Sequence, residues 1–247
     1  MEDAEHVSKR QKVKQKVSAL FDLRERFISA IAMVAIVCAA LWLGNWWWIG
    51  LVVLIAGLVL WEWNRLVVAF DISPLGQVVW LFFGAVYVSA AALALIQVRI
   101  SYGPLETLIV FLAPVVAVDV GAYFSGRAIG GPKIAPSISP GKTWAGLIGG
   151  ALGAGLLGLG IEIADYGPAA GGGFEWLNIA TALIAGAIIA VVAQTGDFFE
   201  SWMKRRAGVK DSSNLIPGHG GVFDRVDGFL AVYFVLFMVA VIPNLLG

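Results

Sequence analysis

The sequence predicts an all-α integral membrane protein, a polytopic bundle of about seven transmembrane helices. Of its 247 residues, 59% are hydrophobic and only 14% are charged, whereas soluble domains carry about 25% charged residues. Long apolar segments recur along the chain, and the basic residues are concentrated in alternate connections between them. The formal net charge is zero, so we expect a lipid bilayer as partner and no nucleic acid.

The apolar segments are close to the ~20 residues that a helix needs to cross a bilayer. They lie at roughly 27–44, 46–64, 75–97, 105–126, 143–164, 176–196 and 228–246. We therefore divide the chain into a basic leader (1–26), N-terminal transmembrane helices (27–104) and a C-terminal region (105–247) that contains the polar segment 197–227. For the leader we expect a solvated tail, and an interfacial amphipathic helix is the alternative.

The distribution of basic residues predicts the orientation. With seven spans and a cytoplasmic N-terminus, 16 of the 17 Lys and Arg residues fall on the inner side, and only Arg99 falls outside. Because inner loops of membrane proteins carry an excess of Lys and Arg, the connections 127–142 and 197–227 are expected to face the cytoplasm.

Three acidic residues flank the polar segment. Asp197 ends the sixth expected span, and Asp224 and Asp227 share a helix face at the start of the seventh. Antiparallel packing of the two spans would bring these carboxylates together, and converging carboxylates without Cys suit a hard cation such as Mg²⁺. The alternative is that the acids cap helices and form salt bridges with neighbouring Lys and Arg.

The same segment has the features of a phosphate-binding site. Gly218, Gly220 and Gly221 permit close backbone approach, and the loop leads into a helix N-terminus, which favours anions. Positive charge comes from Lys204, Arg205, Lys210 and Arg225, although Arg205 and Arg206 could equally be topology anchors. His219 lies between Pro217 and two glycines, and the sequence does not distinguish a base from a hydrogen-bond donor.

A second polar group lies on the fourth expected span. Asp119, Tyr123 and Arg127 are spaced i, i+4 and i+8, so they share one helix face. An ionisable residue inside a membrane helix indicates a functional cavity, and a hydrogen-bonded packing network is the alternative. The sequence Ser139-Pro140-Gly141-Lys142-Thr143 follows, but it is no P-loop because Pro136 occupies the position of the first glycine.

These motifs resemble those of the phosphatidate cytidylyltransferase (CDP-diacylglycerol synthase) family. Residues Ser201 to Asp227 are similar, position for position, to its C-terminal signature. The patterns Asp119-x3-Tyr123-x2-Gly126-Arg127 and Ser139-Pro140-Gly141-Lys142-Thr143-Trp144-x-Gly146 resemble its other blocks. Members of this family are usually drawn with eight or more spans. Eight or nine helices are therefore the alternative to seven, and in that case a polar helix within 127–142 or 197–215 enters the membrane.

The resemblance implies transfer of CMP from CTP to phosphatidic acid, which gives CDP-diacylglycerol and pyrophosphate with Mg²⁺ required. It implies a multi-pass protein of a bacterial-type inner membrane, often a homodimer, with 105–247 as the catalytic region. It also implies that Asp197 and Asp224 are metal ligands and that Asp211 and Asp227 belong to the same site; we add Asp227 to the metal set. The expected catalytic residues are Asp197, Lys204, Lys210, Asp211, His219, Asp224, Arg225 and Asp227.

The expected substrate-binding residues are Asp119, Tyr123, Arg127, Ser139, Lys142, Thr143, Gly220 and Gly221. Lys142 and Lys210 are candidates for the triphosphate of CTP, and Arg127 or Arg225 for the lipid phosphate. One alternative function is another CTP-using membrane lipid enzyme, such as a polyprenol kinase or a CDP-archaeol-type synthase. The other is an ion-coupled transporter, against which the clustering of charge at one face argues.

Overall fold

The computed structural model describes residues 25, 27–166, 176–241 and 243. The leader, apart from Glu25, and the connection at 167–175 lie outside the described residues. Within these ranges the regular structure is helical, and the extended pairing consists of two isolated β-bridges, Lys133 with Thr143 and Ile216 with Gly220. The all-α prediction is therefore confirmed.

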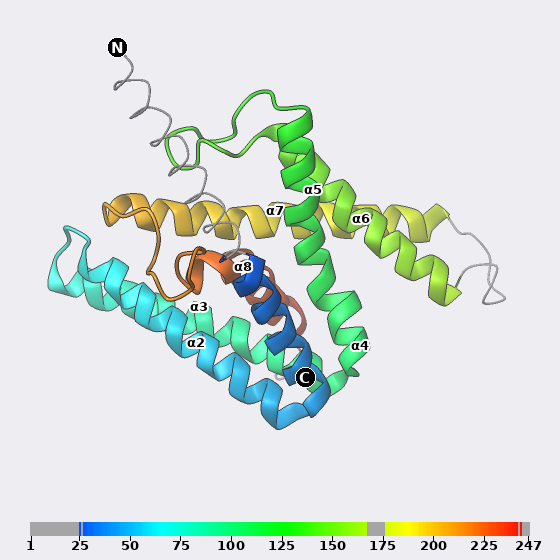
Figure 1. The fold of residues 1–247 in the computed structure, drawn as a ribbon, viewed down its shortest axis with the longest axis horizontal. Helices are drawn as coiled ribbons and strands as arrows, with labels where there is room; N and C mark the ends of the chain where they lie inside the picture. Colours follow the sequence, from blue (N-terminus) through cyan, green and yellow to red (C-terminus); the bar gives the residue numbers. More distant parts are fainter. Residues whose placement is uncertain (1–24, 26, 167–175, 242, 244–247) are drawn as a thin grey trace, which may run out of the picture.

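The helices follow the expected order along the chain (Figure 1). A helix over Phe27–Leu43 is followed by α2 (Asn45–Val68), α3 (Pro74–Ser101), α4 (Pro104–Glu106), the π-helical turn η1 (Thr107–Leu112), α5 (Ala113–Ala128), α6 (Trp144–Tyr166), α7 (Trp176–Arg206), α8 (Phe223–Leu236) and the π-helical turn η3 (Phe237–Val241). Among the described residues, five helices are long and apolar enough to cross a membrane: α2, α3, the continuous α4–η1–α5, α6 and α7. The remaining two expected spans correspond to the shorter Phe27–Leu43 helix and to α8 with η3.

Helix α7 is longer than the apolar pattern indicated. It has 31 residues, which at 1.5 Å per residue give about 46 Å, against a hydrocarbon thickness of about 30 Å. The sixth span was expected to end at residue 196, but the helix continues to Arg206, and the ion pair between Glu200 and Lys204, one turn apart, supports the added turns. It ends before Gly208, which has a φ of 71°. The polar connection is therefore only 207–222.

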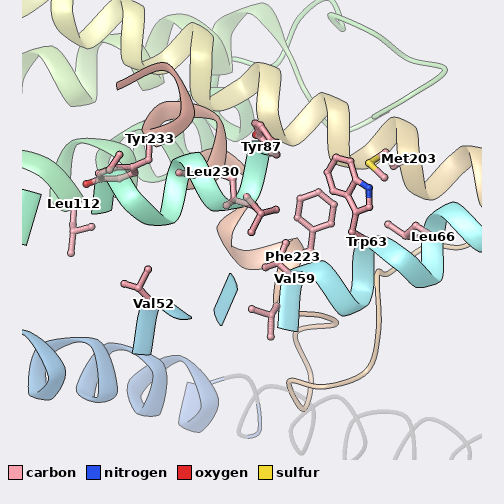
Figure 2. Packing of buried hydrophobic residues seen from close by; sticks show 14 of the residues in the cluster. Val52, Val59, Trp63, Leu66, Tyr87, Leu112, Met203, Phe223, Leu230 and Tyr233 are labelled. Atoms are coloured by element: carbon pink, nitrogen blue, oxygen red, sulfur yellow. The ribbon is translucent and has the colours of Figure 1, made fainter. Parts of the chain in front are cut away.

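Two groups of helices pack on α7. Helices α2, α3 and α8 enclose the main apolar core, in which Trp63 is 1% exposed and lies among Met203, Phe223 and Leu66 (Figure 2). Helices α5 and α6 form the second group, and α6 also contacts α7. Figure 1 shows α7 crossing both groups, so this helix carries side chains toward each of them.

Glycines bring the backbones of α5, α6 and α7 into direct contact. A Cβ atom on Gly121 of α5 would lie 2.3 Å from the carbonyl oxygen of Gly149 in α6. A Cβ atom on Gly186 of α7 would lie 2.3 Å from the nitrogen of Gly155, also in α6. This is the close packing of small residues found between membrane helices, and it explains most of the glycines in the fifth span.

Candidate functional site

A pocket of about 480 Å³ lies between α5, the segment leading into α6, and α7. Its lining includes polar groups from all three elements: Asp119, Tyr123, Arg127, Lys142, Thr143, Gln194 and Asp197. Asp119, Tyr123 and Arg127 line this pocket together, as their spacing on one face of the fourth span predicted. Their role in substrate binding stays a prediction. The structure also brings this face together with Lys142 and Asp197, which the sequence did not connect to it.

The α5 side of the pocket carries a cation and a carboxylate, and both side chains are exposed. The Nη1 atom of Arg127 donates a hydrogen bond to the Tyr123 hydroxyl over 2.9 Å, and Tyr123 is 58% exposed. Asp119, two turns earlier in α5, interacts electrostatically with Asp197, Lys142 and Arg225. The pocket lining therefore contains charges of both signs.

The segment before α6 places Lys142 next to α7. Thr143 is 3% exposed, and its hydroxyl accepts a hydrogen bond from the Gly146 amide over 3.0 Å, which caps the start of α6. Lys142 forms an ion pair with Asp197. Ser139 lies in the preceding turn and is not among the lining residues. Thr143 thus acts as a helix cap that fixes the direction of Lys142.

Asp227 of α8 adjoins Asp197 across the α7–α8 contact. The two carboxyl groups interact electrostatically, and the Asp227 Oδ1 atom accepts the Gly228 amide over 2.9 Å. The approach of the two helices is close because Gly196 has no side chain: a Cβ atom there would lie 2.5 Å from the Asp227 carbonyl oxygen. Asp227 is not among the residues that line the pocket. We call the lining residues Asp119, Lys142 and Asp197, together with their neighbour Asp227, the pocket cluster.

Asp224 belongs to a different set of contacts. Its Oδ1 atom lies 2.5 Å from Lys204 Nζ, and Lys204 also pairs with Glu200 over 2.6 Å. Its Oδ2 atom accepts hydrogen bonds from the Ser212 amide (2.9 Å), the Ser212 hydroxyl (2.8 Å) and the Gly221 amide (2.7 Å). Asp224 therefore holds both ends of the 207–222 connection.

The charge state of Asp224 follows from these donors. The residue lies in the first turn of α8, before the apolar part of that helix. Burial alone would raise the pKa of its carboxyl group, but the hydrogen bonds with Glu200, Lys204, Gly221 and Ser212 hold that pKa below its ordinary value. Asp224 is therefore an anion at neutral pH.

Glu62 of α2 completes this second set, and the sequence analysis missed it. It is 0% exposed, and its two carboxylate oxygens accept hydrogen bonds from the hydroxyl groups of Ser212 and Ser213 and from the amides of Val222 and Phe223. The available signal was an acidic residue in the middle of an apolar span. We call Glu62, Glu200, Lys204 and Asp224 the loop cluster.

The other predicted residues of the polar segment surround the loop cluster and do not line the pocket. His219 Nδ1 lies 2.8 Å from the Ser29 hydroxyl of the first helix. Gly220 has a φ of 83° and packs beside Asp211 and Asp224. Lys210 and Arg225 are exposed, and Arg225 is the one of these that interacts electrostatically with Asp119.

The oxygen donors present suit a magnesium ion completed by substrate. Among the described residues, no group of three or more His, Cys, Asp and Glu side chains is arranged to hold a metal. Mg²⁺ is commonly held by one or two carboxylates together with substrate phosphates and waters. The adjacent Asp197 and Asp227 carboxylates provide such a pair, whereas both oxygens of Asp224 already accept hydrogen bonds from the protein.

Comparison with known proteins identifies the family of this chain. Residues 69–242 match the cytidylyltransferase family. A phosphatidate cytidylyltransferase of Brucella suis is 46% identical over 160 residues, which cover 64% of this chain and 56% of the relative. One of Rickettsia bellii is 34% identical over 223 residues, which cover 87% of this chain and 89% of the relative. The chain thus spans little more than half of the Brucella relative but most of the Rickettsia one, and it belongs to the cytidylyltransferase family.

Proposed function

We propose that this protein transfers CMP from CTP to phosphatidic acid, giving CDP-diacylglycerol and pyrophosphate. The observation that carries the proposal is the pocket that Arg127, Lys142 and Asp197 line together, with Lys142 ion-paired to Asp197, in a bundle of apolar helices long enough to cross a membrane. Cations and a paired carboxylate in one cavity suit two anionic substrates that must approach each other. The names of the relatives in Brucella and Rickettsia point to the same reaction.

The reaction needs no nucleophilic side chain. A phosphate monoester has a second pKa of about 6, so the phosphate of phosphatidic acid is already an anion at neutral pH. One of its oxygens attacks the α-phosphorus of CTP, a new P–O bond forms, and the bond to the β-phosphate oxygen breaks in line to release pyrophosphate. The protein has to orient the two substrates and neutralise their charge.

Each charged residue of the pocket would have a separate role in binding the substrates. Lys142 would exchange its ion pair with Asp197 for the triphosphate of CTP when the nucleotide binds. Arg127, at the exposed side of the pocket, would bind the lipid phosphate, while Tyr123 holds its guanidinium. Asp197 and Asp227 would hold Mg²⁺, with Asp224 remaining a predicted ligand, and the ion would neutralise charge on the phosphates. Asp119 would orient Lys142 from the opposite wall.

We also propose that the protein lies in the inner membrane of a bacterial cell with the pocket facing the cytoplasm, where CTP is available. The asymmetric distribution of Lys and Arg supports this orientation. Leu215, 45% exposed in the polar connection, and Tyr102, 49% exposed at the α3–α4 turn, allow a test. In a Cys38→Ser background, a membrane-impermeant maleimide applied to intact cells should label Tyr102→Cys and spare Leu215→Cys; the reverse pattern would invert the topology.

The activity is tested by product identification. The purified protein is incubated with phosphatidic acid, Mg²⁺ and CTP labelled in the cytosine, and the lipids are separated by thin-layer chromatography. A labelled liponucleotide that requires phosphatidic acid supports the proposal. If label enters lipid only with an archaeal ether lipid acceptor, a CDP-archaeol-type synthase is indicated. Phosphorylation of a polyprenol from γ-labelled CTP would instead indicate a kinase, and no turnover with any acceptor would favour a transporter.

A further inference from the structure

The start of α8 is capped by a residue from another membrane helix. The first amides of a helix have no partner within the helix, and the residue at the N-cap position of α8, Val222, provides no side-chain cap. Glu62 of α2 supplies the missing acceptors: its Oε1 accepts the Val222 amide over 2.9 Å and its Oε2 accepts the Phe223 amide over 2.6 Å. The axial position of α8 is therefore set from α2.

Glu62 and Asp224 hold the same loop residue. The Ser212 hydroxyl lies 3.1 Å from Glu62 Oε2 and 2.8 Å from Asp224 Oδ2. A hydroxyl group has one proton to donate, so the two carboxylates share it, while the Ser212 amide donates to Asp224. The Ser213 hydroxyl donates to Glu62 alone. One buried carboxylate, that of Glu62, thus accepts hydrogen bonds from both ends of the segment 212–223.

The surroundings of Glu62 are closely packed. A Cβ atom on Gly221 would lie 2.5 Å from Glu62 Oε1 and 2.0 Å from the Ser212 hydroxyl. The next residue, Trp63, donates its indole N–H to the Trp80 carbonyl over 3.0 Å, and a Cβ atom on Gly84 would lie 2.4 Å from its ring. These contacts of Trp63 fix α2 against α3 next to Glu62, and they thereby hold the Glu62 carboxylate in place.

We propose that Glu62 is a positioning residue of the active site: by capping α8 it sets the register in which Asp227, one turn further on, meets Asp197. The inference rests on the proposed cytidylyltransferase function and extends it to a residue that precedes the 69–242 family match. The N-terminal membrane helices then contribute to catalysis as well as to anchoring. Glu62 does not itself contact substrate.

The test compares Glu62→Gln with Glu106→Gln, an exposed acid at the start of the fourth span. Glutamine keeps the size of the side chain but replaces one acceptor oxygen with a donor group, so one of the two α8 amides loses its partner. Removal of a residue that orients a ligand costs about 10- to 100-fold in activity. We expect a loss of that size in kcat per folded protein, with a smaller change in KM for CTP, and wild-type kinetics for Glu106→Gln.

Amide hydrogen exchange provides a readout that is independent of turnover. The amides of Val222 and Phe223 report the cap, and the Gly228 amide, which donates to Asp227, reports the position of that carboxylate. All three should exchange faster in Glu62→Gln than in wild type. Faster exchange with unchanged kcat, or a loss of activity that only follows the loss of folded protein, would overturn the proposal.

A second variant covers the case in which Glu62→Gln does not fold. Glu62→Asp keeps the charge but shortens the side chain by one methylene group, so it reaches fewer of the four donors, and it should give an intermediate loss of kcat with the same exchange pattern. Wild-type kcat in this variant, despite faster exchange of the Phe223 amide, would overturn the proposal. If wild type itself makes no CDP-diacylglycerol, the proposed function fails, whereas the exchange data still decide whether Glu62 positions α8.

Discussion

The pocket cluster and the loop cluster contain the same kinds of side chain, and both take residues from α7 and α8, where Asp197 and Glu200, like Asp224 and Asp227, are about one turn apart. The two clusters differ in the partners of their carboxylates. In the loop cluster, both oxygens of Glu62 accept hydrogen bonds from backbone and hydroxyl donors. Oδ2 of Asp224 accepts such bonds as well, while its Oδ1 pairs with Lys204. In the pocket cluster, Asp197 faces a cavity and is paired with Lys142. A carboxylate that accepts several hydrogen bonds from the protein stabilises the structure. A carboxylate that is paired with one lysine beside a cavity can release that lysine to a ligand.

The largest effect that would sharpen this comparison is expected from Asp197→Asn and Asp227→Asn. Asparagine keeps the shape but removes the charge, and loss of one group that stabilises the transition state costs about 10²- to 10³-fold in rate. Turnover should fall by at least that factor, and higher Mg²⁺ concentrations should restore little of it. The measurement is CDP-diacylglycerol formation as a function of Mg²⁺ concentration.

Asp71→Asn is the matched control, because Asp71 is an exposed acid in the α2–α3 connection. It should behave as wild type throughout the Mg²⁺ titration. Near-normal turnover at low Mg²⁺ in both Asp197→Asn and Asp227→Asn would remove the pair from the site and would erase the distinction between the clusters.

Substitution of Lys204, the cation of the loop cluster, should affect stability before activity. Lys204 is largely buried between Glu200 and Asp224, whose side chains are 1% and 4% exposed. Removal of one partner from a buried ion pair costs about 3–5 kcal/mol, so Lys204→Met should strongly lower the midpoint of thermal unfolding in detergent. Asp197→Asn should shift that midpoint much less. Equal shifts in the two variants would contradict the division into a structural and a catalytic cluster.

The sequence predicted the helices and one wall of the pocket, for reasons that are local. Hydropathy identifies the spans, and the spacing of Asp119, Tyr123 and Arg127 places them on one face. The sequence could not separate Asp224 from Asp227, because both lie on the same face of α8 and the choice depends on the close approach at Gly196. Glu62 was missed because its four donors lie 150 to 161 positions later in the chain, in the polar connection and at the start of α8.

Gly221→Ala tests by steric overlap whether the loop cluster holds the polar connection in place. The added Cβ atom would overlap the Ser212 hydroxyl and the Glu62 carboxylate, and overpacking of a close-packed site costs about 1–3 kcal/mol. We expect a moderate loss of stability together with faster hydrogen exchange in the loop. Gly57→Ala in α2 meets no atom within 4 Å and should leave both measurements unchanged; a tolerated Gly221→Ala would show that the loop is not held at this point.

The smallest effect is expected at Lys210. This side chain is exposed and outside the pocket lining, and an exposed charge pair contributes about 0.2–1 kcal/mol. Lys210→Ala should therefore raise KM for CTP by at most about 5-fold at constant kcat, as expected for a residue that only binds the ground state. A large fall in kcat would move Lys210 into the catalytic group and would show that the loop closes over the nucleotide.

The glycine contacts among α5, α6 and α7 have a consequence for how substrates enter. Because backbone touches backbone at Gly121, Gly149, Gly155 and Gly186, α6 is held close to both α5 and α7, and little change in their spacing is expected when a ligand binds. Tyr123 lines the pocket and is 58% exposed, which makes its side of the pocket the expected entrance. If the substrate is the proposed diacyl lipid, its phosphate would enter there while its chains stay in the bilayer, so the lipid would not have to leave the membrane plane.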